Sequence, residues 1–195
     1  MADEARDPRE ELIGPHGGYR KLASYQVATI VYDATMAFCA RFVRPGSRTR
    51  DQMEQAARSG KQNISEGSEA SGTSSKTELK LTGVARASLE ELLQDYEDFL
   101  RQHGLPIWGR QDAQAQAVRR LAQVPNRSYE TYRTYVEKGS PEVAANAVIC
   151  LVHQANYLLD RQLRGLEERF LRQGGFTERL YEARRRARER GEGAR

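Results

Sequence analysis

The chain has 195 residues, of which 38% are hydrophobic and 30% are charged, and its formal net charge is +4. These values fit one folded domain, or one domain with an appendage, whose helices keep wide polar faces. The sequence contains no run of about 18 apolar residues, which excludes a membrane-spanning helix and a membrane partner. The first eleven residues are acidic and lack the apolar core of a secretory signal, so we expect a cytoplasmic protein.

The positive charge is concentrated near the carboxyl end of the sequence. Residues 179–195 contain seven arginines and three glutamates, an excess of four that equals the net charge of the whole chain. Residues 1–178 are therefore neutral in sum. A basic surface on the main body requires local segregation of charge rather than a basic bulk composition.

Residues 1–18 are charged and contain several prolines and glycines, which predicts a disordered N-terminal lead. From about Tyr19 to Arg44 the pattern predicts a helix that is apolar over most of its circumference. One stripe consists of Leu22, Tyr25, Thr29, Tyr32, Met36, Cys39 and Val43. A second band consists of Val27, Ile30, Val31, Ala34, Phe38 and Phe42. Such a helix is buried on more than one side, so its second side meets either another subunit or a wide core within the chain.

Small residues form the predicted buried seam of the second helix, which spans about residues 49–70. The seam residues recur at alternating spacings of four and three: Met53, Ala57, Gly60, Ile64 and Gly67. Each glycine costs a free helix about 1 kcal/mol relative to alanine, which indicates that a neighbouring backbone comes close there. Capping-box spacings at residues 49–52 and 75–78 open this helix and a third one, which runs to about Gln102. The short turn at residues 71–74 makes the two helices antiparallel neighbours.

Residues 105–139 do not show the pattern of another long helix. Asp112 is expected to cap a short helix that ends before Pro125. Tyr129, Tyr132 and Tyr135 follow at helical spacing. They either stack on nucleic-acid bases or pack against the bundle, and packing is the favoured interpretation.

A serine, a proline and an acid at residues 140–142 predict the start of the next long helix, which continues to about Gln173. Two glycines end it, and Thr177 opens a basic C-terminal helix or tail over residues 176–195. No strand pattern occurs. The predicted fold is all-α: an antiparallel up-down four-helix bundle over residues 19–175, with an inserted helical segment at 105–139 and a C-terminal helical extension.

One run in the second helix resembles a known family. Residues 56–59 read Ala-Ala-Arg-Ser and lead into Asn63, Ile64, Ser65, Glu66 and Gly67. A Ser/Thr-rich turn and a basic, leucine-rich third helix follow. This arrangement resembles the four-helix-bundle family of the 23S rRNA intervening-sequence proteins, to which the accessory variability determinant of diversity-generating retroelements also belongs. The resemblance covers about residues 19–103 directly and 141–173 more loosely.

The insertion at 105–139 and the extension past Gly174 resemble the subset of this family that carries a four-helix-bundle suffix region. The resemblance implies an up-down bundle that assembles into a homopentamer. For the accessory variability determinant it also implies a basic surface that binds nucleic acid, RNA or DNA, and a partner reverse transcriptase.

The candidate nucleic-acid-binding residues form two groups. The first group lies on the second and third helices and consists of Arg48, Arg50, Arg58, Lys61, Lys76 and Lys80. The second group lies in the tail and consists of Arg184, Arg185 and Arg186. Against a role in binding, the acids near the first group are able to neutralise it, and the tail is equally explained as a solubilising terminus. Those acids are Asp51, Glu54, Glu66, Glu69 and Glu78.

The remaining polar residues favour structure over chemistry. Asn63 and Glu66 are expected to bond across the bundle or to serve the helix end near Gly67, rather than to catalyse. His153, Asn156 and Asp160 share a helix face and fit an interhelical hydrogen-bond network. No metal-ligand spacing and no phosphate-cradling glycine loop occurs, so no catalytic residue, metal or cofactor is predicted. We expect a non-enzymatic homo-oligomer that binds nucleic acid, with a protein–protein adaptor as the alternative.

Overall fold

The computed structural model describes residue 13 and residues 16–192, and all regular structure in this part of the chain is helical. Most of the predicted disordered lead therefore lies outside the described residues, as do residues 193–195. The long helices are α1 (Ala23–Phe42), α2 (Arg48–Ala70), α3 (Ser75–Gln102), α6 (Pro141–Gln173) and α7 (Phe176–Glu192). The shorter ones are η2 (Tyr19–Lys21), α4 (Ala113–Arg120), η3 (Leu121–Gln123), α5 (Tyr129–Arg133) and the π-helical η4 (Thr134–Lys138). Within the described residues, no helix has the length and apolar character needed to cross a membrane.

Side-chain caps fix where the long helices begin. Ser140 accepts a hydrogen bond from the Val143 amide, and Pro141 follows at the first helical position, as predicted. The caps of α2 and α3 are instead Ser47 and Ser74, so the predicted capping boxes at residues 49–52 and 75–78 were wrong in register. In each case an earlier serine supplies the same hydroxyl to an exposed helix amide, and the helix begins there.

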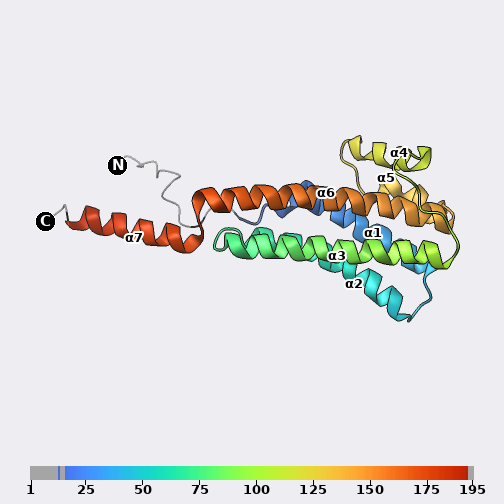
Figure 1. Ribbon diagram of the computed structural model, residues 1–195, viewed down its shortest axis with the longest axis horizontal. Coiled ribbons are helices and arrows are strands. Elements are labelled where there is room, and N and C mark those ends of the chain that lie inside the picture. The colour runs from blue at the N-terminus through green and yellow to red at the C-terminus, as the bar shows by residue number, and fades with distance from the viewer. Residues whose placement is uncertain (1–12, 14–15, 193–195) are drawn as a thin grey trace.

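Four long helices, α1, α2, α3 and α6, pack side by side along the body of the molecule (Figure 1). α2 contacts α1 and α3, and α6 contacts the same two helices from the other side. The predicted seam of α2 faces this core, since all five of its residues are buried. A Cβ atom on Gly60 would lie 2.5 Å from Leu89 Cδ2, and one on Gly67 would lie 3.3 Å from the Glu78 carbonyl oxygen. The close approach of a neighbouring backbone is confirmed at Gly67, whereas the close neighbour of Gly60 is the Leu89 side chain.

The two apolar bands of the first helix have different environments. Val27, Val31 and Phe38 of the second band are fully buried, whereas Tyr25, Tyr32 and Met36 of the first stripe are half-buried. The helix itself is shorter than predicted, because η2 and the extended Leu22 precede α1.

Part of the inserted segment packs against α1. α5 and η4 both contact it, and Arg41 of α1 donates to the carbonyl oxygens of Val136 and Gly139. No large hydrophobic side chain of α1 is exposed. The wide intramolecular core thus buries most of the second apolar band of α1, while Tyr25, Tyr32 and Met36 of the first stripe stay half-buried.

The insertion forms a small helical layer on α6 and α1. Tyr132 is buried, and Tyr129 and Tyr135 are half-buried against the core, which confirms the packing interpretation of the three tyrosines. Asp112 does precede α4, but its carboxylate accepts from the Gly109 amide at 2.7 Å instead of capping the helix. Asp112 is thus the N-cap residue of α4, as predicted, but its side chain accepts no capping hydrogen bond from the helix.

α7 follows the turn at Gly174, where φ is +64°, and projects away from the packed helices as a separate rod (Figure 1). The first turn of α3 lies at the end of the molecule from which α7 projects. This end is the part of the fold on which the candidate site depends.

Candidate nucleic-acid interface

The six basic candidates on α2 and α3 do not share one surface. Arg48 and Arg50 lie in the first turn of α2, whereas Lys76 and Lys80 lie near the start of α3. The two pairs are separated by about 20 residues of α2, or about 30 Å along a helix axis. Sequence spacing alone placed these residues in one group, but the fold divides them between opposite ends of the molecule.

At the α1–α2 end, one of the two arginines is already paired. Arg50 Nε donates to Glu54 Oε1 at 2.7 Å, and this hydrogen bond raises the pKa of Arg50. Arg48 is exposed. The Arg50 charge is thus compensated within its own helix by Glu54, one of the acids expected to neutralise this group.

Lys61 is directed toward α1 instead of outward. Its Nζ lies 4.4 Å from the centroid of the Tyr32 ring, a cation–π distance. Burial raises the pKa of the neighbouring Asp33, and the positive charge of Lys61 opposes that rise. Arg58, three residues earlier, is exposed. The two residues therefore do not form the outward basic pair that their spacing suggested.

Lys76 and Lys80 are exposed, while the acid between them in the sequence is not. Glu78 is 8% exposed, and its Oε2 lies 3.3 Å from Arg169 Nη2 of α6. Burial raises the pKa of Glu78, and the positive charge of Arg169 opposes the rise. No ion pair of either lysine occurs among the residues that the structure describes. Glu78 is two residues from each lysine and lies on the opposite, core-facing side of α3, so it does not neutralise this lysine pair.

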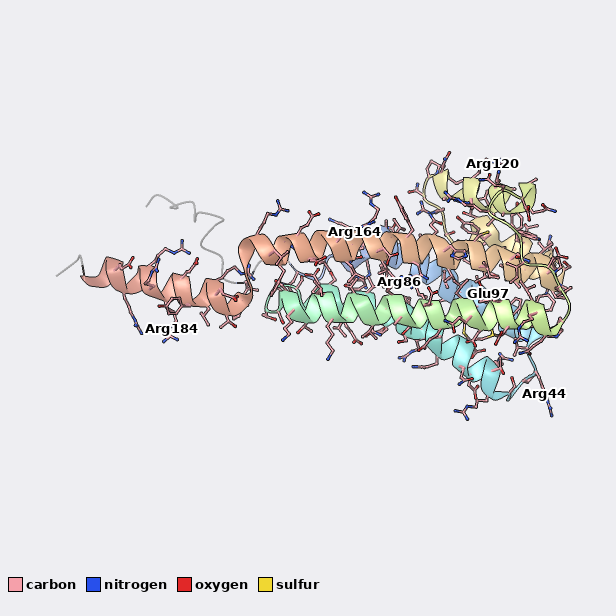
Figure 2. All side chains as sticks on the ribbon, viewed as in Figure 1. Arg44, Arg86, Glu97, Arg120, Arg164 and Arg184 are labelled. Atoms are coloured by element: carbon pink, nitrogen blue, oxygen red, sulfur yellow. The ribbon has the colours of Figure 1, made fainter. Side chains whose placement is uncertain are left out.

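The three candidate arginines of α7 are exposed on the projecting rod, where Figure 2 labels Arg184. Their ion pairs stay within the helix: Arg185 lies 3.5 Å from Glu189, and Arg186 lies 4.0 Å from Glu182. Exposed ion pairs of this kind stabilise a protein by about 0–1 kcal/mol each. Each arginine would therefore exchange its glutamate partner readily for another anion. The rod thus continues the basic character of Lys76 and Lys80 beyond the packed helices.

Residues 63–67, which carry the family resemblance, take part in the packing and hydrogen bonding of α2. Asn63 Nδ2 donates to the Ser59 carbonyl oxygen at 2.9 Å and to Ser59 Oγ at 3.0 Å. Ser59 Oγ in turn lies 2.9 Å from Ser88 Oγ of α3. Ile64 and Gly67 are buried in the seam, and Glu66 is exposed. Asn63 thus anchors a short polar link between α2 and α3.

The polar face of α6 also joins helices. Arg86 of α3 donates to Asp160 at 3.0 Å and to Glu90 at 2.6 Å, and Asn156 donates to the same Glu90 carboxylate at 3.0 Å. The interhelical network is confirmed for Asn156 and Asp160. His153 is exposed and lies outside it.

Sequence reasoning missed the inward orientation of Glu78. A signal was present, because Glu78 precedes the buried Thr82, Ala85 and Leu89 by four, seven and eleven residues. That spacing places its side chain on the core face of α3. Its partner Arg169 could not be read from the sequence, because the two residues are 91 positions apart.

Cys39 is buried, Cys150 is half-buried, and neither forms a disulfide. Within residues 16–192 no group of three His, Cys, Asp or Glu side chains is placed to hold a metal ion. Comparison of the chain with protein-family models, with curated proteins and with solved structures finds no match.

Proposed function

We propose that this protein is a non-enzymatic nucleic-acid-binding protein that contacts the phosphate backbone through its basic end. The basic end consists of Lys76 and Lys80 at the start of α3 and of Arg184, Arg185 and Arg186 on the projecting α7. It would recognise RNA or DNA by charge and shape rather than by base sequence, because lysine and exposed arginine contacts to phosphate carry no sequence information.

The observation that carries this proposal is the exposure of Lys76 and Lys80 on one face of α3. Two lysines four residues apart lie on one helix face and reinforce each other's potential. No ion pair of either lysine occurs among the described residues, and Glu78 lies on the opposite, core-facing side of the helix, buried against Arg169.

The shape of this end supports the same function. α7 extends past the packed helices and carries its arginines away from the body, so a nucleic acid would contact the start of α3 and the rod together (Figure 2). Binding of this type releases counterions from the nucleic acid, and each phosphate contact adds about 0.7–0.9 to the slope of log K against log salt.

The proposal is tested by reversing the lysine charges in the full chain. K76E/K80E is compared with R120E/K138E, which changes the net charge equally but alters exposed residues of α4 and η4, far from the basic end. Binding of a labelled single-stranded RNA and a labelled DNA duplex is followed by fluorescence anisotropy between about 50 and 200 mM salt.

We expect K76E/K80E to weaken binding by about tenfold or more and to reduce the salt slope by about two, while R120E/K138E stays close to wild type. Equal losses in the two variants would mean that only net charge matters. A wild-type affinity that does not change with salt would reject phosphate contacts altogether.

We also propose that α1, α2, α3 and α6 form an up-down four-helix bundle. The contacts of each helix with two of the others and the short connections at residues 43–47 and 71–74 support this topology. Assembly into a homo-oligomer, and into a pentamer in particular, rests on the family resemblance, because no large apolar side chain of α1 is exposed. Light scattering of the purified protein measures the subunit count directly.

A protein–protein adaptor is the second candidate, favoured by two exposed apolar side chains near the α6–α7 junction. Leu171 is 76% exposed and Tyr181 is 68% exposed. An adaptor would use them to dock another polypeptide, such as the reverse transcriptase that the resemblance implies. For an adaptor, K76E/K80E leaves partner binding intact and L171S/Y181S abolishes it; the nucleic-acid function predicts no loss of RNA affinity in L171S/Y181S.

A further inference from the structure

A cavity of about 750 Å³ lies at the other end of the molecule, between α4, the segment before it and the outer face of α6. This size is typical of sites that enclose a small organic molecule, about 300–1,000 Å³. Its apolar walls come from Ala115 and Val118 of α4, Ile149 and Leu158 of α6, and Trp108 of the preceding segment. The cavity is separate from the basic end and has no part in the proposed nucleic-acid binding.

Polar contacts hold the mouth of the cavity in place. The Trp108 backbone amide donates to Asn146 Oδ1 at 2.8 Å, and the Trp108 indole donates to Glu142 at 2.9 Å. Asn146 also donates to the Pro106 carbonyl oxygen at 2.9 Å. The segment that precedes α4 is thereby fixed to the start of α6, so the cavity is largely pre-formed.

The charged residues that line the cavity all favour an anion. The lining includes Arg110 and Arg119 but no aspartate or glutamate. Arg119 donates to the Arg110 carbonyl oxygen at 3.5 Å, which brings the two residues together at the rim. Burial raises the pKa of Cys150 on the cavity wall, and the Arg119 charge opposes that rise, so this charge acts on the interior of the site.

Tyr132 contributes to the inner wall and is 1% exposed. The two arginines at the rim therefore carry the preference for a ligand with an anionic, acceptor-rich group.

We propose that the cavity binds an amphipathic organic carboxylate, whose apolar body packs on Ala115, Val118 and Ile149 while its carboxylate is held by Arg119 and Arg110. An apolar surface with a small number of charged groups at its rim is the usual design of such sites, and arginine matches the geometry of a carboxylate.

Decanoate is a suitable probe, and the chain carries its own reporter. Trp108 is the one tryptophan in the sequence and lines the cavity, so a change in tryptophan fluorescence on titration reports this site alone. Isothermal titration calorimetry on the full chain gives the affinity. The cation decyltrimethylammonium has the same apolar chain and the opposite charge, and we expect it to bind at least about tenfold more weakly.

The matched variants are R119Q and R120Q, on neighbouring residues of the same short helix. Arg119 lines the cavity, whereas Arg120 is exposed on the outer side of α4, where Figure 2 labels it. R119Q removes a charge-assisted hydrogen bond to the carboxylate and should weaken decanoate binding by about tenfold, with R120Q within about twofold of wild type. Unfolding midpoints of both variants are measured to show that each is folded.

Three results would overturn the proposal: no saturable change in Trp108 fluorescence with decanoate, equal affinities for decanoate and the cation, or equal losses in R119Q and R120Q. The K76E/K80E variant separates this proposal from the proposed function. It should bind decanoate like wild type, whatever its affinity for nucleic acid.

Discussion

The carboxylate of Glu78 lies 3.3 Å from the guanidinium of Arg169, and this ion pair joins the first turn of α3 to the last turns of α6. Glu78 is almost completely buried, while about half of the Arg169 side chain is exposed. The pair therefore fixes the end of the molecule from which α7 projects, and it removes from the surface the one acid that lies between Lys76 and Lys80.

The first prediction concerns the pH dependence of this pair. Burial raises the pKa of Glu78 above 4.5 despite Arg169, so the folded protein holds the Glu78 proton more tightly than the unfolded chain. The stabilisation from this proton is complete below about pH 4.5 and is lost as the pH rises through the raised pKa. In E78Q the side chain stays neutral, so the free energy of unfolding should decline less between pH 4 and pH 7 than in wild type.

Urea unfolding at several pH values measures this effect, with E66Q as the control because Glu66 is exposed on α2. The E66Q profile should run parallel to that of wild type. Burial also raises the pKa of Asp33 and Asp95, and both remain in each variant. An E78Q profile parallel to wild type would show that Glu78 does not titrate differently in the folded protein.

The second prediction concerns the seam between α2 and α3. A Cβ atom on Gly60 would lie 2.5 Å from Cδ2 and 2.7 Å from Cγ of the fully buried Leu89. G60A should therefore lower the free energy of unfolding by about 1–3 kcal/mol, because overpacking outweighs the gain of about 1 kcal/mol in helix propensity. G83A is the matched control, since a Cβ atom on Gly83 of α3 meets no atom within 4 Å. It should stabilise the protein by about 0.5–1 kcal/mol, and a stabilising G60A would disprove the tight contact.

The third prediction concerns the arginines of α7. Replacing Arg184, Arg185 and Arg186 by glutamine removes three exposed charges whose ion pairs lie within α7. The free energy of unfolding should change by less than about 0.5 kcal/mol, since surface substitutions of this kind have small effects. Nucleic-acid affinity should fall, and the salt slope should decrease by about two to three. Unchanged binding in salt titrations would assign α7 a solubilising role and leave Lys76 and Lys80 as the binding residues.

The fourth prediction concerns the two thiols. Cys39 is fully buried, and burial raises its pKa to about 12; burial also raises the pKa of the half-buried Cys150 above 9.0. Because the thiolate is the reactive form, native Cys39 should resist iodoacetamide, and Cys150 should react more slowly than a free cysteine, with a rate that still increases above pH 9. Mass spectrometry of wild type, C39S and C150S identifies the modified residue. Equal modification of both thiols in the folded protein would contradict the burial of Cys39.

Several features of the fold could be predicted from local sequence because they depend on residues three and four apart. The seam of α2 is an example: its spacing identified Gly60 and Gly67 as buried, closely packed positions, with the expected backbone neighbour at Gly67 and the Leu89 side chain at Gly60. The start of α6 at Ser140 is another, since the cap and the proline act on the same helical turn. The N-cap of α2 was misplaced by two residues, because Ser47 and Thr49 offer nearly the same cap.

The candidate site could be predicted only in its residue types. Lys76 and Lys80 were identified from their spacing. The ion pair of Glu78 could not be identified in this way, because its partner Arg169 lies 91 residues away. Lys61 and Arg58 were both predicted to face outward, but the packing of α1 against α2 brings the Tyr32 ring into cation–π contact with Lys61. Arg119, at the rim of the cavity, was not identified from the sequence at all. The cavity forms only when α4 packs on α6, and the two helices are distant in the chain.

The sequence by itself determined where the long helices run and which of their faces are apolar, since both follow from hydrophobic periodicity and capping chemistry within a few residues. The tertiary structure alone decided what covers each face. It brought α5 and η4 into contact with α1, and it paired the inward-facing Glu78 with Arg169 of α6. The physical reason is that burial and charge compensation depend on partners distant in the chain, whose positions are set only when the helices pack together.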